Sequence, residues 1–133
     1  MTINQSINKR WIGSPPQSYN QLTGEIPNGE ARTASRDAEI KQRSWSDVGR
    51  LKSFLLDHNQ IQGTIPEDLP TRLGSSLLDL DLGANRLTGT IPSTVGKMTK
   101  LELLDVHGNQ LTGRLPPEMN RMYPDVQLNL TDN

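Results

Sequence analysis

The sequence contains no cysteine among its 133 residues, so disulfide bonds and thiolate metal sites are excluded. Aromatic residues make up only 4% of the chain and hydrophobic residues 32%, a thin supply for the core of a compact globule. A solenoid needs less, because small aliphatic side chains fill its narrow core one layer at a time. The length fits a single domain, and these scarcities favour a solenoid.

Charge of one sign and long apolar runs are also scarce. Charged residues are 22% of the chain and the net charge is -1, which argues against nucleic acid or an anionic membrane surface as partner. No stretch approaches the roughly 20 apolar residues of a membrane helix, and residues 1–10 contain no apolar run of signal-peptide length. As written, the chain is expected to lack a membrane span and an export signal. The compartment stays open, because the lack of cysteine fits a reducing compartment but also occurs in secreted proteins.

What the sequence does contain is a repeat. Apolar residues and one asparagine recur at relative positions 1, 4, 6, 9 and 11 of two blocks that lie 24 residues apart. Each block continues with Thr-Gly and then with Ile-Pro or Leu-Pro. The spacing L-x-x-L-x-L-x-x-N-x-L is that of a leucine-rich repeat. The members are Leu77, Leu80, Leu82, Asn85 and Leu87, and then Leu101, Leu104, Val106, Asn109 and Leu111.

A repeat domain is predicted over residues 45–133, preceded by two regions of different character. Residues 1–19 are polar and lack periodicity, so we expect a poorly ordered N-terminal tail. Residues 20–44 hold the second half of a degenerate repeat and then a charged insertion, for which a short helix and a flexible excursion are both open. The repeat domain divides into three full repeats and a truncated one: 51–76, 77–100, 101–124 and 125–133.

The spacing predicts an α/β solenoid, a right-handed coil with a short parallel β-sheet on its concave face. The leucines at positions 4 and 6 share one face of a strand because side chains alternate along it, and each repeat adds one strand. Irregular or 3₁₀ turns are expected on the convex face, where apolar residues spaced by three or four cover the outer side of the core. These residues are Ile65, Leu69, Leu73, Ile91, Val95, Met98, Leu115, Met119 and Met122.

The asparagine at position 9 is expected where the chain turns away from the strand. Its amide offers both donors and an acceptor, so the four equivalents are predicted to bond backbone groups of their own and neighbouring turns. The alternative is an exposed turn asparagine, which the shared register disfavours. The predicted ladder consists of Asn59, Asn85, Asn109 and Asn133.

Residues 80–92 and 109–116 follow almost residue for residue the unit LxxLxLxxNxLTGxIPxxLxxL, so the chain closely resembles plant-type leucine-rich repeat proteins. The resemblance covers residues 45–133 well and 20–27 in part. It implies part of the ectodomain of a receptor-like protein or receptor-like kinase, a module that binds peptides, proteins or small hormones mostly on the concave sheet. For a fragment of such a protein, it implies an extracellular or membrane-associated location. The chain departs from the family in lacking its cysteine-containing caps.

The outward strand positions, with the residues just beyond them, form a candidate ligand-binding face. Aspartates and two histidines gather there, and no basic residue lies among them. One interpretation is an acidic face for a basic peptide or protein loop. The other is that aspartate between the leucines is the usual pattern of these repeats and requires no ligand. The candidate residues are Ser53, Leu55, Asp57, His58, Asp79, Asp81, Leu103, Asp105, His107, Gln127 and Asn129.

No catalytic residue, metal site or cofactor is predicted. Strands stacked at ~4.8 Å would place His58 and His107, two repeats apart, ~9.6 Å from each other along the stack. That separation does not suit zinc, whose nitrogen ligands lie ~2 Å away. No nucleophile–base pair or phosphate-binding loop is present either. An enzymatic or metal-binding role therefore ranks last, and the chain is expected not to be an enzyme.

A structural role is the main alternative to recognition. The chain would then be a vestigial or truncated repeat fragment. Its final strand, around residues 128–130, would be an uncapped edge that is ready to pair with another chain. This interpretation predicts self-association through the C-terminal edge.

Overall fold

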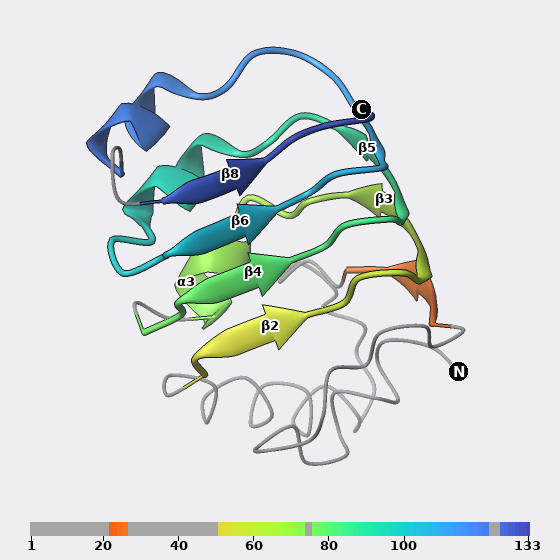
Figure 1. Ribbon diagram of the computed structural model, residues 1–133, viewed down its shortest axis with the longest axis horizontal. Coiled ribbons are helices and arrows are strands. Elements are labelled where there is room, and N and C mark those ends of the chain that lie inside the picture. The colour runs from red at the N-terminus through yellow and green to blue at the C-terminus, as the bar shows by residue number, and fades with distance from the viewer. Residues whose placement is uncertain (1–21, 27–50, 74–75, 123–125) are drawn as a thin grey trace, which may run out of the picture.

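The computed structural model describes residues 22–26, 51–73, 76–122 and 126–133, which form a solenoid of stacked repeats (Figure 1). The predicted tail over residues 1–19 and the charged insertion lie outside the described residues. The elements in chain order are β1 (Thr23–Glu25), β2 (Ser53–Leu55), β3 (Gln60–Thr64), α3 (Leu69–Leu73), β4 (Asp79–Asp81), β5 (Arg86–Gly89), η2 (Ser93–Lys97), β6 (Leu103–Asp105), β7 (Gln110–Leu111), η3 (Pro117–Arg121) and β8 (Gln127–Asn129).

The predicted parallel sheet is confirmed, with strand order β2-β4-β6-β8. The register is constant from repeat to repeat: Phe54 pairs with Leu80, Leu80 with Leu104, and Leu104 with Leu128. In each of the first three strands the central side chain is buried and its two neighbours are half-buried. Side-chain alternation therefore sends one residue of each strand into the core and leaves two to form the outer face.

A second parallel sheet, with strand order β1-β3-β5-β7, was not predicted. The expectation of one short parallel sheet, with irregular or 3₁₀ turns on the convex face, was incomplete for this reason. These strands carry glycines with positive φ, such as Gly63 at 83° and Gly89 at 80°, which in a sequence indicate turns. One feature of the sequence does indicate a strand here: polar and apolar residues alternate. In the structure the buried Ile61 lies between the exposed Gln60 and Gln62.

Short helical turns cover the core on the convex side, as predicted: α3, η2 and η3 lie at equivalent places in successive repeats. Most of the apolar residues assigned to this side are buried, and Ile91 is half-buried. Leu115 is the exception, because 40% of it is exposed. It belongs to the last full repeat, and no further repeat in the described residues covers it.

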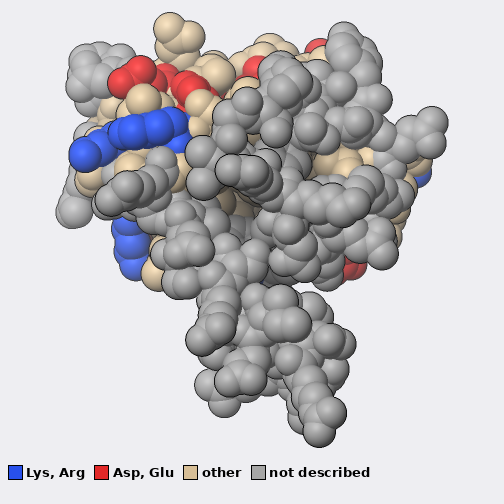
Figure 2. All heavy atoms as spheres, turned by 90° about the horizontal axis from the view of Figure 1, so that it is seen from below, with Lys and Arg blue, Asp and Glu red and all other residues tan. Residues whose placement is uncertain are grey.

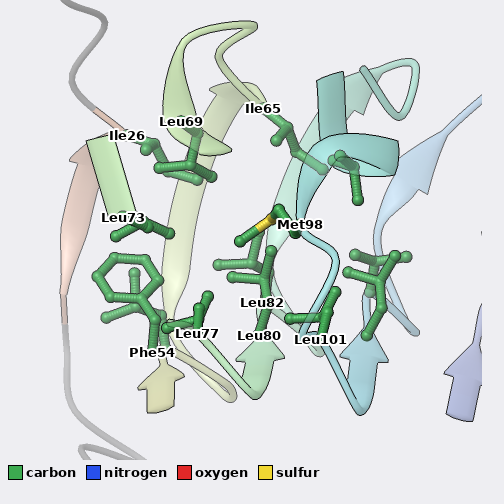
Figure 3. Close-up of a cluster of buried hydrophobic side chains, with 14 of the residues drawn as sticks. Ile26, Phe54, Ile65, Leu69, Leu73, Leu77, Leu80, Leu82, Met98 and Leu101 are labelled. Carbon is green, nitrogen blue, oxygen red and sulfur yellow. The ribbon is translucent and has the colours of Figure 1, made fainter. Parts of the chain in front are cut away.

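The core is a single column between the two sheets and the helical turns. Figure 3 shows its side chains in successive layers, with Phe54 and Leu73 at one end and Met98 and Leu101 further along. Leu82, Leu87 and Val106 are completely shielded from solvent. The half-repeat at residues 22–26 joins this column through Leu22 and Ile26, and β1 pairs with β3.

Candidate functional site

The concave sheet presents the predicted candidate residues in two rows that run across the strands. The outer row is Ser53, Asp79, Leu103 and Gln127. The aspartate row is Leu55, Asp81, Asp105 and Asn129. Asp57 and His58 follow β2, and His107 follows β6. The constant strand register thus places all the candidate residues on one side of the sheet, at or just beyond the strand ends.

Hydrogen bonds between neighbouring repeats satisfy some of these side chains. Ser53 Oγ donates to Asp79 Oδ2 at 2.6 Å in the outer row. In the aspartate row, Asn129 Nδ2 donates to Asp105 Oδ2 at 2.9 Å. These two carboxylates are therefore partly committed to contacts within the protein.

Asp81 and Asp105 play the same local role in successive repeats. Oδ1 of Asp81 accepts a hydrogen bond from the Gly83 N–H at 2.9 Å, and Oδ1 of Asp105 accepts one from the His107 N–H at the same distance. A carboxylate that bonds the backbone two residues later stabilises the turn after the strand. This contact gives aspartate a structural reason to stand between the leucines, in line with the interpretation that needs no ligand. The two residues differ at Oδ2, because no side chain among the described residues donates to that oxygen of Asp81.

Each histidine is paired with an aspartate that lies one or two residues earlier in the chain. Nδ1 of His107 lies 2.6 Å from Asp105 Oδ1, and Nδ1 of His58 lies 3.0 Å from Asp57 Oδ2. The ring centroids of His58 and His107 are 6.3 Å apart, with the ring planes at 65°. The prediction that the histidines are separated by ~9.6 Å, two repeat spacings, was therefore wrong for the rings.

The repeat between the two histidines explains why the rings converge. Gly83 occupies the position equivalent to His107 one repeat earlier, and a Cβ atom on Gly83 would overlap Nδ1 of His107. The His107 ring therefore fills space that any other residue would take, and it leans over the preceding repeat toward His58. The sequence-based distance missed the effect of Gly83 because strand spacing gives the distance between backbones and not between rings. The sequence does mark this position, since Gly83 is the glycine among equivalent residues that are otherwise Asp57, His107 and Thr131.

Burial raises the pKa of the Asp81 carboxyl above its usual value, and the charges of Asp105 and Asp57 raise it further, against the opposing hydrogen bond from Gly83. Burial acts in the same direction on Asp105, but the hydrogen bonds from His107 and Asn129 outweigh it and lower the pKa of Asp105. The hydrogen bond to Asp105 raises the pKa of His107. Asp105 and His107 therefore favour the ion pair, whereas the ionised form of Asp81 is disfavoured in the folded protein, although the charge of His107 partly offsets this effect.

Acidic side chains also gather at one edge of the molecule in Figure 2 (upper left), where a basic side chain lies beside them. The described residues contain no group of three or more His, Cys, Asp or Glu side chains that could hold a metal ion. Across the same ranges, none of the helices has the length and apolar character that crossing a bilayer demands.

The ladder asparagines lie directly behind this face and join the two sheets. Oδ1 of each accepts the N–H of a residue beside or within the second sheet of the preceding repeat, at 2.9 to 3.1 Å. Their Nδ2 atoms donate to backbone carbonyls of their own turn and, for Asn85, Asn109 and Asn133, also of the turn before. The pairs through Oδ1 are Asn59 with Leu22, Asn85 with Ile61, Asn109 with Leu87, and Asn133 with Leu111.

A family model described as Leucine Rich Repeat matches residues 50–71, 76–98 and 100–122, just over half of the chain. Receptor-like protein 35 of Arabidopsis thaliana is 36% identical over 95 residues, which are 67% of this chain and 10% of that protein. Serine/threonine-protein kinase BRI1-like 1 of the same organism is 36% identical over 70 residues, 53% of this chain and 5% of that protein. The chain thus spans a tenth or less of the length of these two curated relatives.

Solved structures of plant receptors share the fold. The plant peptide hormone receptor RGFR1, in complex with RGF2, matches 88% of this chain with a TM-score of 0.66 and 31% identity, over 16% of its own chain. The ectodomain of the Arabidopsis thaliana membrane receptor kinase GASSHO1/SCHENGEN3, in complex with CASPARIAN STRIP INTEGRITY FACTOR 2, matches 86% with a TM-score of 0.65 and 27% identity, over 12% of its own chain. The Arabidopsis thaliana BIR3–SERK2 complex matches 89% with a TM-score of 0.64 and 27% identity, over 53% of that chain.

Proposed function

Because the chain belongs to the leucine-rich repeat family, in its plant type, we propose that it is a non-catalytic recognition module that binds a peptide or protein on its concave sheet. The sheet offers two rows of side chains on one side of four parallel strands, all half-buried except the exposed Gln127. Leu55 and Leu103 add apolar surface to a face that is otherwise polar. The solved relatives RGFR1 and GASSHO1 were captured with RGF2 and CASPARIAN STRIP INTEGRITY FACTOR 2, which supports the same class of role for this chain.

The ligand we propose is cationic, and the observation that carries this is the state of Asp81. Asp79 accepts from Ser53, and Asp105 is paired with His107 and Asn129, but Oδ2 of Asp81 receives no side-chain donor within the described part of the chain. Asp81 also lies between the charges of Asp57 and Asp105. An arginine or lysine of a ligand would relieve that repulsion and form a charge-assisted hydrogen bond.

A charge-reversal experiment tests this proposal. Ligands are first selected from a random peptide library on the immobilised protein, and their affinities are then measured for the D81K/D105K double variant. We expect the selected peptides to be rich in arginine or lysine and their binding to be abolished. The matched control is E67K/E118K, which makes the same change in net charge at exposed residues of the convex side. Equal loss in both doubles, or retained binding in D81K/D105K, would contradict an acidic concave site.

Self-association is the second candidate function, favoured by the surface beyond β8. On its outer side β8 pairs with no other described strand, Leu115 is 40% exposed, and Leu128 and Leu130 are only partly buried. Open strand edges beside apolar surface promote pairing with a second chain. Sedimentation should then show a dimer that dissociates on dilution and that L115K weakens. A strict monomer at high concentration would contradict this candidate.

We further propose that these residues belong to the extracellular part of a longer, membrane-associated repeat protein, because the relatives are receptor-like proteins and receptor ectodomains. The intact mass of the protein from its native source tests this. A mass well above 14.8 kDa, or an attached glycan, is expected. A species of 14.8 kDa without glycan would contradict the proposed location.

A further inference from the structure

The ring of His107 on the concave face lies over the preceding repeat and not over its own. Its ring rests over Gly83 of the preceding repeat, where even one Cβ atom would come within 2.5 Å of Cε1. Its Nδ1 is bonded to Asp105, and its ring edge contacts His58 from two repeats earlier. The side chain thereby bridges three repeats across the row in which ligand binding is proposed.

Carboxylates face His107 from every neighbouring repeat. Asp105 is its direct partner, Asp81 contributes from the end of β4, and Asp132 contributes from the turn after β8. On the far side stand His58 and its partner Asp57, after β2. The hydrogen bond to Asp105 and the charges of Asp105, Asp81 and Asp132 raise the pKa of His107, against the opposing effect of burial. A single proton on this ring therefore changes the balance of charge among these carboxylates.

The composition of the chain confines side-chain titration near neutral pH to its histidines. The sequence contains two histidines and no cysteine, so these rings are the only side chains whose ordinary pKa lies between pH 5.5 and 8.5. Lysines, arginines and tyrosines remain protonated over this range, and carboxylates with ordinary pKa values remain ionised.

We propose that His107 regulates the concave face with pH, so that the face holds a cationic ligand more tightly when His107 is neutral than when it is protonated. The inference rests on the proposed function. When His107 is protonated, its charge cancels that of Asp105. When the proton leaves, the charge of Asp105 is no longer cancelled, and the face gains one net negative charge next to Asp81, the carboxylate assigned to the ligand.

The direction follows from linkage. A cation bound beside Asp81 disfavours the protonated ring, so binding should release a proton from the protein at pH values near the midpoint of His107. One charge at close range under partial solvent screening is worth about a 3- to 10-fold change in affinity. Binding should therefore strengthen by about that factor from pH 5.5 to 8.5, and the change should shrink at high salt.

The test uses the whole chain and a hexa-arginine peptide that is acetylated at its N-terminus and amidated at its C-terminus. This probe carries no group that titrates between pH 5.5 and 8.5. Titration calorimetry at fixed ionic strength gives the affinity across that range. Repeating the measurement in two buffers of different ionisation enthalpy gives the protons released. We expect tighter binding at high pH and proton release in the wild type, with both largely lost in H107Q and retained in H58Q.

Each outcome bears on the proposal. Binding that is independent of pH, or whose pH dependence survives in H107Q, would overturn the role of His107 and leave the recognition proposal standing. No binding of hexa-arginine at any pH would overturn both. G83A gives a second test, because its Cβ must displace the His107 ring while every ionisable group is kept. In G83A the midpoint of the pH dependence should fall toward 6.5, the ordinary value for histidine.

Discussion

Oδ1 of Asn109 accepts a hydrogen bond at 2.9 Å from the backbone N–H of Leu87, 22 residues earlier in the chain. The same side chain donates through Nδ2 to the carbonyls of Leu82 and Val106, at 3.0 and 2.9 Å. One buried amide therefore ties the second sheet of one repeat to the turns that end two strands of the concave sheet. Because the contact recurs at Asn59, Asn85 and Asn133, it holds the two sheets in a fixed relation along the stack.

Replacing Asn109 by alanine should destabilise the protein by about 1–3 kcal/mol, because it leaves the buried Leu87 N–H without its acceptor. The carbonyls of Leu82 and Val106 each lose one donor but still accept from Asn85 and Asn133. Urea denaturation followed by circular dichroism measures this change. The control is N120A, at an exposed position of η3, which should change the unfolding free energy by less than about 0.5 kcal/mol. Equal effects of N109A and N120A would show that the ladder contributes nothing.

Two glycines of the second sheet distinguish the backbone strain that a side chain would cause from its steric overlap with a neighbour. Gly24 has a φ of 106° and open space where a Cβ atom would lie, whereas Gly89 has a φ of 80° and a Cβ there would lie 2.9 Å from Thr64 Cγ2. G24A should cost only backbone strain, about 1–2 kcal/mol, and G89A should cost more because Thr64 must also move. Denaturation of G89A/T64S provides the check, since removing Cγ2 should recover the difference. No recovery in the double variant would mean that the backbone term accounts for the whole cost of G89A.

Stability should depend on pH through His107. Its pKa is raised above 6.5 in the folded protein, so its contribution is fully present below pH 6.5 and is lost as the pH rises through the folded value. Asp105 acts in another window: its pKa is lowered below 3.8, so its contribution is present above pH 3.8 and is lost as the pH falls through the folded value. Unfolding free energies at pH 6 and 8.5 should differ in the wild type. H107Q should reduce that difference, and an unchanged difference would contradict the assignment.

The concave sheet was predictable because its determinants are local and periodic. Leu80 and Leu104 recur at a fixed interval, and side-chain alternation then decides which residues face outward. The positions of Asp81 and Asp105 side by side follow from the same register.

The second sheet and the histidine contact depend on information that periodicity does not carry. In β3 and β5, glycines with positive φ continue the strand, although the same residues elsewhere end one. The rings of His58 and His107 meet because Gly83 lacks a side chain, and their separation reflects side-chain direction more than strand spacing. Leu115 was misassigned to the core because burial in a solenoid requires a neighbouring repeat as well as the right spacing.

The charge of Asp81 is expected to lower the stability of the folded protein and to strengthen the binding of a cationic ligand. Its raised pKa means that the ionised form is disfavoured in the folded protein, mainly by burial and then by the charges of Asp105 and Asp57. D81N keeps an oxygen that can accept from the Gly83 N–H and removes the charge, so it should raise the unfolding free energy at pH 7 by on the order of 0.5 kcal/mol. The same change should weaken a cationic peptide ligand, because it removes the carboxylate assigned to that ligand. D79N is the matched control, since Asp79 already accepts from Ser53. A D81N protein that is less stable than the wild type, or that binds the peptide equally well, would show that Asp81 serves the turn rather than the ligand.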